Sequence, residues 1–324
     1  MIRKWIALKI LFTSVGRRVE LVQEFKNAAK NLNIDLNIIG ADYSDTAPAL
    51  FFCDSSLKVC KINDENYIPM LIYYCKKEKV DLLIPTIDTD LLILSKYKYK
   101  FKDIGTQVFI SSEDKIKICR DKRETALFFD SVGLKTPIPI DDYKKYDLGF
   151  PAFIKPKDGS SSINAFKVND ESELETYSKE VPDYIIAPFI EGTEYTIDAF
   201  CDIDGSPIFI TPRIRLAVRS GEVLKTQIVQ DDKIINEAKK IIENFKPCGP
   251  ITIQLIRQTT TGDDYYIEIN PRFGGGAPLS MKAGANSAEA TLKMLAGERL
   301  HFVHDAAEDG AVYSRFDQSV RVKW

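Results

Sequence analysis

The chain has 324 residues, of which 44% are hydrophobic and 28% are charged, and its formal net charge is −3 at pH 7. This length suits two or three packed units with a sizeable core rather than one ordinary domain. Lysine and arginine are dispersed among aspartate and glutamate, which argues against a nucleic-acid-binding face, so we expect small-molecule partners. No apolar stretch approaches the ~20 residues of a membrane helix, and we expect a cytoplasmic protein with no membrane partner.

Histidine and cysteine offer little chemistry. The only histidines are His301 and His304, which disfavours a mechanism built on a histidine base or a histidine-rich metal site. The cysteines have no paired short spacing, which argues against a zinc site or a redox dithiol and favours buried, reduced thiols. We therefore expect the chemistry to depend on carboxylates, lysines, arginines, backbone amides and a metal ion.

The first third of the chain alternates strands with helices. We expect an amphipathic helix from Val19 and strands at 9–13, 34–40, 80–85 and 107–110. Such alternation predicts a parallel α/β sheet. The first turn has one glycine, Gly16, where a dinucleotide-binding fingerprint has three, so nicotinamide binding is disfavoured. Asp42 and Asp88 follow expected strands at the edge where open α/β sheets bind ligands, although caps and turns explain such residues equally well.

A lysine followed by a small-residue loop marks the middle of the chain. After a helix expected at 114–132, a short strand carries Lys155, and the loop at 157–162 follows directly. Flexible backbone amides beside a point charge suit a phosphate, but an ordinary hairpin turn has the same composition. The loop lacks the Gly-Lys-Ser/Thr order of a P-loop.

Two arginines are expected on one face of a later strand. Strands are predicted at 184–190 and 208–216, and the second carries Arg213 and Arg215 two residues apart. This pair suits a carboxylate or a phosphate, with a solvated β face as the alternative. The helix expected at 231–246 is amphipathic and carries no chemistry that we can assign.

The stretch at 265–276 carries hard metal ligands, and its pattern is typical of an alternating strand followed by a glycine turn. Glu268 and Asn270 point to one face of this strand and offer the oxygen ligands that Mg²⁺ takes, usually together with substrate phosphates. A hairpin with the preceding strand places Gln254 within reach of Glu268, and Arg272 could hold a phosphate at the end of the strand. A surface hairpin with ordinary polar residues is the alternative.

Four ordered motifs carry a resemblance to a known family. They are the helix opening at Asp121-Lys122, the strand Phe153-Ile154-Lys155-Pro156 with its loop, Phe189-Ile190-Glu191-Gly192-Thr193-Glu194-Tyr195, and Ile267-Glu268-Ile269-Asn270-Pro271-Arg272. Over about residues 9–296 the chain resembles the ATP-grasp superfamily, and most closely its carbamoyl-phosphate-synthase-like branch of single-chain ligases.

The resemblance implies a mixed α/β and α+β fold. An N-terminal parallel α/β (pre-ATP-grasp) domain would occupy 1–112. A two-subdomain ATP-grasp fold would follow, with a small lid subdomain at 113–187 and a catalytic subdomain with a C-terminal tail at 188–324. Within the last part, 278–296 is expected to be mostly helical.

The resemblance also implies which residues bind ATP. Its phosphates would be contacted by Lys122 and Lys155 and covered by a lid made of Gly159, Ser160, Ser161 and Ser162. The adenine amino group would donate to the carbonyl of Pro188, while Ile190 would offer its N–H and Glu194 would accept from the ribose. The family often carries an acidic-basic pair where this chain has Ala187-Pro188, so purine selectivity would depend on the backbone.

The metal and the reacting groups are implied in the same way. Mg²⁺, with Mn²⁺ as an alternative, would be held by Glu268 and Asn270 with Gln254 beside them, and Arg272 would meet the transferring phosphoryl group. A neutral amide at Gln254, where the family often has an acid, puts a second metal ion in doubt. Arg213 and Arg215 are expected to hold the substrate carboxylate or its intermediate.

The resulting expectation is an ATP-dependent ligase that joins a small-molecule carboxylate to an amine through an acyl phosphate, releasing ADP and phosphate. Two alternatives stay open. One is a catalytically silent ATP-binding regulatory protein of the same fold, and the other is a biotin-dependent carboxylase component. A homodimer is also left open.

Overall fold

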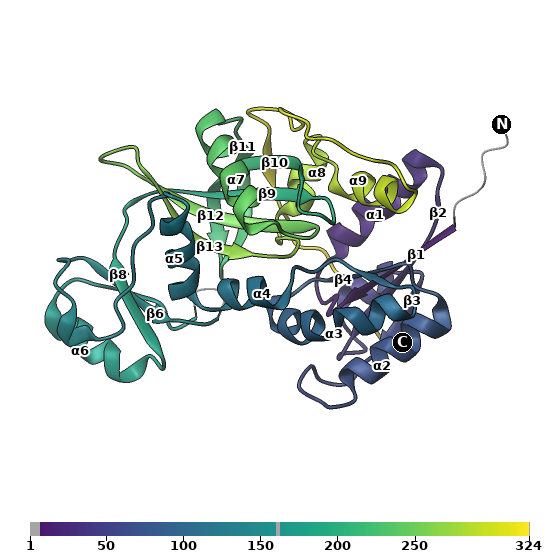
Figure 1. Cartoon of the computed structure of the whole chain (residues 1–324), viewed down its shortest axis with the longest axis horizontal. Coiled ribbons are helices and arrows are strands. Elements are labelled where there is room, and N and C mark those ends of the chain that lie inside the picture. The colour runs from purple at the N-terminus through teal and green to yellow at the C-terminus, as the bar shows by residue number, and fades with distance from the viewer. Residues whose placement is uncertain (1–6, 160–162, 324) are drawn as a thin grey trace.

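The computed structural model describes residues 7–159 and 163–323, and within them the strands form three sheets (Figure 1). A parallel sheet in the N-terminal third is followed by a small antiparallel sheet and then by a larger antiparallel one. The predicted order of a parallel α/β domain before a two-part α+β unit is thus confirmed.

The parallel sheet has the order β3 (Ser55–Lys58), β2 (Asp35–Asp42), β1 (Ala7–Thr13), β4 (Leu82–Pro85) and β5 (Gln107–Val108). Its connections include α1 (Val19–Leu32), α2 (Tyr67–Glu78), α3 (Leu91–Asp103) and the 3-10 turns η1 (Pro48–Phe52) and η2 (Asp88–Asp90). The four predicted strands are confirmed. Strand β3 was not predicted, because its short Ser-Ser-Leu-Lys sequence is mostly exposed and has no apolar run.

A break divides the helix predicted at 114–132. The structure instead has α4 (Glu113–Arg120) and α5 (Lys122–Ser131), separated by Asp121 in an extended conformation. The Asp121 carboxylate accepts a hydrogen bond from the backbone N–H of Arg123 at 2.9 Å, which caps the new helix. The single-helix prediction was wrong because apolar spacing continues across the cap.

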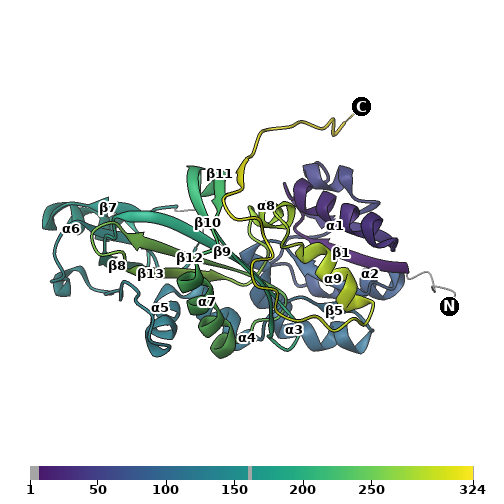
Figure 2. The same ribbon diagram turned by 90° about the horizontal axis from the view of Figure 1, so that it is seen from above.

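The small sheet has the order β7 (Phe166–Val168), β6 (Ala152–Pro156) and β8 (Tyr184–Pro188), with η3 (Tyr143–Lys145) preceding it and α6 (Glu171–Glu180) packed on it. Its core is a separate small cluster that includes Ile154, Leu174 and Ile186. Strand β8 ends at Pro188, two residues before the predicted end. This sheet and α6 form a lobe set apart from the rest of the chain (Figures 1 and 2).

The large sheet has the order β13 (Asp264–Asn270), β12 (Pro250–Gln258), β9 (Gly192–Cys201), β10 (Pro207–Arg219), β11 (Glu222–Ile228) and β14 (Val312–Ser314). Helix α7 (Asp232–Phe245) buries its predicted isoleucine stripe against this sheet. The predicted hairpin between β12 and β13 is confirmed, and its register pairs Gln254 with Glu268.

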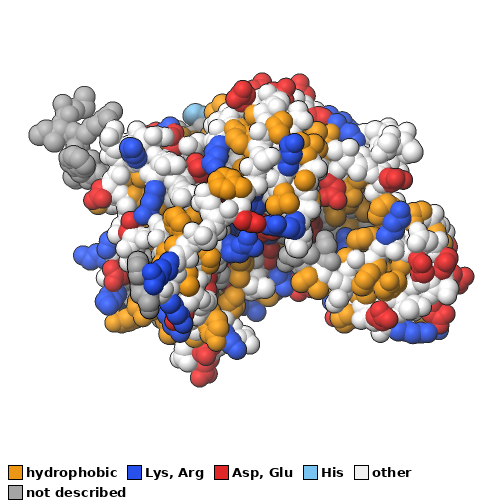
Figure 3. All heavy atoms as spheres, turned by 180° about the vertical axis from the view of Figure 1, so that it is seen from behind, with side chains coloured by type: hydrophobic (Ala, Val, Ile, Leu, Met, Phe, Trp, Pro, Cys, Tyr) orange, Lys and Arg blue, Asp and Glu red, His pale blue; other side chains and the backbone are white. Residues whose placement is uncertain are grey.

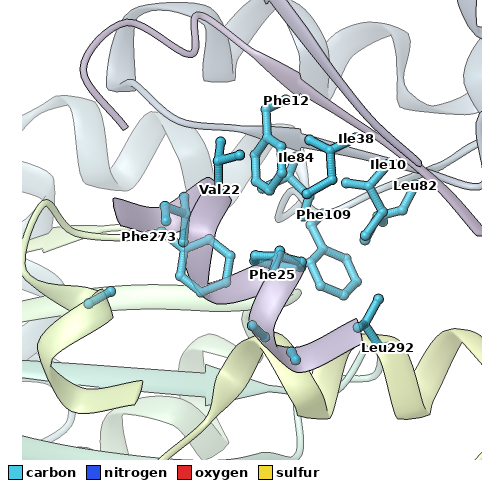
Figure 4. Close-up of a cluster of buried hydrophobic side chains, with 14 of the residues drawn as sticks. Ile10, Phe12, Val22, Phe25, Ile38, Leu82, Ile84, Phe109, Phe273 and Leu292 are labelled. Atoms are coloured by element: carbon cyan, nitrogen blue, oxygen red, sulfur yellow. The ribbon is translucent and has the colours of Figure 1, made fainter. Parts of the chain in front are cut away.

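Two short helices return the chain to the N-terminal domain. The stretch expected to be helical at 278–296 is α8 (Ala277–Lys282) and α9 (Ser287–Leu295), separated at Gly284, whose φ of +124° suits glycine. Both helices pack with α1 around a shared core that includes Phe25 and Phe273 (Figure 4). Among the described residues, no helix combines the length and apolar composition needed to span a bilayer.

Candidate functional site

Two lysines from different elements lie near the loop after β6. Lys122 opens α5, and its Nζ donates to the carbonyl of Gly159 at 2.8 Å. Lys155 lies on β6, where burial and then the charge of Lys122 lower its pKa to about 8, opposed by Glu268. Burial likewise lowers the pKa of Lys122, again opposed by Glu268. These lysines and Glu268 are therefore electrostatically coupled, and a bound polyphosphate would stabilise both ammonium groups.

The predicted metal ligands lie together on the facing hairpin. Gln254 of β12 is the register partner of Glu268 of β13, and the side-chain amide of Asn270 donates to Glu268 Oε1 at 2.9 Å. Among residues 7–159 and 163–323, no group of three or more His, Cys, Asp or Glu side chains could hold a metal ion. One carboxylate with neighbouring amide oxygens fits Mg²⁺ when nucleotide phosphates complete its ligands.

A cavity of about 400 Å³, its open mouth included, joins these groups. It is lined by Lys122 and Gly159 on one side and by Glu268 and Asn270 on the other. Figure 3 shows the smaller lobe separated from the main body by a hollow, near which lysine and arginine side chains gather. The predicted lid residues Ser160, Ser161 and Ser162 lie outside the described residues.

The predicted adenine and ribose contacts lie at the junction of the two antiparallel sheets. Pro188 ends β8, and Ile190 lies in the connection to β9, which carries Glu194. The Glu194 side chain is 52% exposed and forms an ion pair with Arg215 at 3.3 Å. Arg215 Nη1 also donates to Gln254 Oε1 at 3.4 Å. Arg215 therefore lies beside the predicted nucleotide and metal residues.

Arg213 is placed differently from its neighbour on β10. Its Nε donates to Asp198 Oδ2 at 2.8 Å, and the two side chains are 3% and 9% exposed. Its Nη1 is buried and has no hydrogen-bond partner among the described residues, and a Cβ atom built on Gly276 would lie 2.6 Å from its Nη2. Arg213 thus packs under the glycine turn. The structure does not bring Arg213 and Arg215 together as one exposed binding site for a carboxylate.

Arg272 joins the large sheet to the parallel one. Its Nη2 lies 2.6 Å from Asp88 Oδ2, at the carboxyl end of β4, while its buried Nε has no hydrogen-bond partner within residues 7–159 and 163–323. The next residue, Phe273, packs edge-on against Phe25 of α1 with ring centroids 6.1 Å apart. The turn that carries Arg272 is therefore fixed against the N-terminal domain.

Three further charged residues near this turn were missed from the sequence. Arg18 Nη2 donates to the carbonyl of Thr86 at 3.2 Å, and burial followed by the charge of Arg272 lowers the pKa of Arg18 to about 10. Glu222 and Arg315 lie beside it. The two arginines after Gly16 are the available sequence signal, but the local pattern of the first turn does not give them a partner.

Two family models match consecutive parts of the chain. Residues 10–109 match the PylC-like N-terminal domain, and residues 119–276 match the ATP-grasp domain. The carbamoyl phosphate synthase large chain of Methanosphaerula palustris is 26% identical over 296 residues, covering 83% of this chain. This chain spans only 27% of the length of that relative.

Solved structures share the fold at low sequence identity. The biotin carboxylase domain of Hydrogenobacter thermophilus 2-oxoglutarate carboxylase, in complex with MgADP and bicarbonate, has a TM-score of 0.76 at 17% identity, covering 95% of this chain and 74% of that one. Staphylococcus aureus N5-carboxyaminoimidazole synthetase complexed with ADP has a TM-score of 0.74 at 16% identity. The match covers 93% of this chain and 80% of that one. The predicted fold class is confirmed, and the chain contains an ATP-grasp domain.

Proposed function

We propose that this chain, a member of the ATP-grasp superfamily, is a ligase that joins a small carboxylate to an amine through an acyl phosphate. The observation that carries the proposal is the meeting of Lys122 with Glu268 and Asn270 across one cavity, while the charges of Lys122 and Glu268 both act on Lys155. Cations on one side and oxygen ligands on the other suit a triphosphate with Mg²⁺ at its distal end.

Each residue has a proposed part in binding ATP. Lys122 and Lys155 contact its phosphates, and Glu194 accepts from the ribose, which requires its ion pair with Arg215 to loosen. Pro188 and Ile190 offer backbone groups to adenine. Glu268 and Asn270 would hold Mg²⁺ or Mn²⁺, which would supply charge neutralisation at the phosphates.

The reaction has two balanced steps. A carboxylate oxygen attacks the γ-phosphorus, the bond to the bridging oxygen breaks, and ADP leaves. The amine nitrogen then attacks the acyl carbon, phosphate leaves with the oxygen from the carboxylate, and the nitrogen loses a proton. Arg272, held at the cavity end of β13 by Asp88, stabilises the negative charge on the transferring group.

A pooled substrate screen tests the proposal. The intact protein is incubated with ATP, Mg²⁺ and pools of carboxylates and amines, and ADP and phosphate are measured. We expect release that depends on both additions and falls at least 100-fold in Glu268→Gln, by loss of the metal carboxylate. Glu180→Gln, at the exposed end of α6, is the control and should match the wild type.

Three outcomes would contradict the proposal. If ATP binds but no pool stimulates turnover, the silent regulatory alternative is favoured. Release stimulated only by bicarbonate with biotin indicates a biotin-dependent carboxylase component. Formation of AMP in place of ADP indicates an adenylate mechanism.

A further inference from the structure

The C-terminal segment reaches the site through its backbone. Strand β14 pairs antiparallel with β11, and Arg315 donates its backbone N–H to the carbonyl of Leu224 at 2.7 Å. Farther along β11, the N–H of Ile228 donates to the carbonyl of Ala311 at 2.9 Å. Figure 2 shows this segment passing beside α8 and β11. The position of Arg315 therefore does not depend on its own side chain.

The Arg315 side chain bridges two carboxylates from different domains. Its Nη1 donates to Glu222 Oε2 at 3.0 Å, and its Nε lies 3.6 Å from Glu20 Oε2 on α1. The Arg315 side chain is 25% exposed, whereas that of Glu222 is 53% exposed. Glu222 can thus turn into solvent while Arg315 stays in place.

Glu222 lies between two arginines above the glycine turn. A Cβ atom built on Gly275 would lie 2.9 Å from Glu222 Oε2 and 2.9 Å from Arg18 Nη1. Burial by itself would raise the pKa of Glu222, but the hydrogen bond from Arg315 and the charge of Arg18 lower it below its usual value. The space over Gly275 therefore favours an anionic carboxylate.

We propose that Arg18 and Arg315 form the binding site for the substrate carboxylate, and that Glu222 occupies this site until substrate displaces it. Two guanidinium groups suit a carboxylate, and Gly275 leaves room for it close to the backbone. The site lies three residues beyond Arg272, at the proposed phosphoryl-transfer end of the cavity. The statement that this carboxylate becomes phosphorylated rests on the proposed function.

The proposal replaces the expected grip of Arg213 and Arg215. Arg213 is committed to buried Asp198, and Arg215 lies beside Glu194 and Gln254. It also gives the C-terminal segment, which lies beyond the matched ATP-grasp region, a part in substrate selection.

Malonate binding to the intact protein, measured by calorimetry with saturating ADP and Mg²⁺, tests the inference. We expect saturable binding in the wild type and at least tenfold weaker binding in Arg315→Gln and Arg18→Gln. Glu222→Gln should bind malonate more tightly, because it removes the internal competitor. Neutral malonamide should not bind.

Arg219→Gln is the matched control, because it breaks an exposed ion pair with Asp317 of the same segment and should leave malonate affinity unchanged. ADP affinity and the unfolding temperature confirm that each variant is folded. Absence of malonate binding in the wild type, unchanged affinity in Arg315→Gln, or weaker affinity in Glu222→Gln would each overturn the inference. These results do not require turnover, so a failed ligase screen is distinguishable from them.

Discussion

Arg272 and Asp88 form an ion pair with 2.6 Å between Nη2 and Oδ2, although 184 residues separate them in the chain. The pair connects the turn after β13 to the carboxyl end of β4, and its side chains are only 12% and 14% exposed. It therefore fixes the proposed phosphoryl-transfer residue relative to the N-terminal domain.

Asp88→Asn should release Arg272 from this position. We expect the free energy of unfolding to fall by about 1–3 kcal/mol, because a charged hydrogen bond is lost from a mostly buried arginine. Urea unfolding measures this loss. The control is Asp45→Asn, whose pair with Lys58 is 3.8 Å long and exposed, so the change should stay within about 0.5 kcal/mol. Equal unfolding midpoints for the two variants would contradict this role.

A second ion pair, between Arg213 and Asp198, lies beneath the glycine turn. Asp198→Asn leaves the charge of Arg213 buried without its partner, and we expect a loss of about 3–5 kcal/mol in the free energy of unfolding. The control is Asp317→Asn, which removes the partner of Arg219. Arg219 lies on the same strand as Arg213, but its ion pair is exposed. Its loss should be below about 1 kcal/mol. A small loss in Asp198→Asn, measured by urea unfolding, would show that Arg213 is not held as described.

The cap of α5 should affect both stability and nucleotide binding. Asp121→Ala removes the side-chain acceptor at the start of this helix, which should cost about 1 kcal/mol and misplace Lys122. Asp170→Ala removes the equivalent cap of α6, where the carboxylate accepts from the N–H of Glu173 at 2.9 Å. Both variants should lose stability, and Asp121→Ala should lose more because its carboxylate also accepts from Arg123 Nη2 at 2.6 Å, but only Asp121→Ala should bind ATP more weakly. Equal ATP affinities of the two variants, measured by calorimetry, would show that the cap of α5 does not position Lys122 for ATP binding.

The charge of Lys155 makes ATP affinity dependent on pH. Its pKa is about 8 in the free protein, so the ammonium form is lost as the pH rises through that value. Affinity for ATP should weaken by up to about tenfold between pH 7 and pH 9. Lys155→Arg keeps its charge throughout this range, so its affinity should vary less. An identical pH profile in both proteins would exclude Lys155 as the titrating contact.

Local pattern was sufficient for most of the fold and for part of the site. The alternating strand from Tyr265 and its glycine turn predicted the shared face of Glu268 and Asn270, and the hairpin predicted the pairing with Gln254. These features depend on neighbours within about twenty residues. The break at Asp121 could not be predicted from apolar spacing, because a side-chain hydrogen bond ends one helix and caps the next without interrupting that spacing.

Contacts between distant segments could not be predicted from one sequence. The pairing of β14 with β11 depends on backbone hydrogen bonds from a segment with little apolar pattern, so Arg315 was not expected near Glu222. Arg213 and Arg215 share a strand face, yet each pairs with a different acid of the neighbouring strand β9. Arg213 pairs with buried Asp198, and Arg215 pairs with exposed Glu194. Period-two spacing gives the face of a strand and cannot identify its partners.

The fate of the carboxylate oxygen tests the proposed ligase reaction most directly. Carboxylates labelled with ¹⁸O are supplied with ATP, Mg²⁺ and the amine pool, and the released phosphate is analysed by mass spectrometry. An acyl phosphate transfers one labelled oxygen to phosphate for each ADP formed, and Glu268→Gln should abolish this transfer. Turnover that depends on both substrates but gives unlabelled phosphate, or gives AMP, would contradict the mechanism.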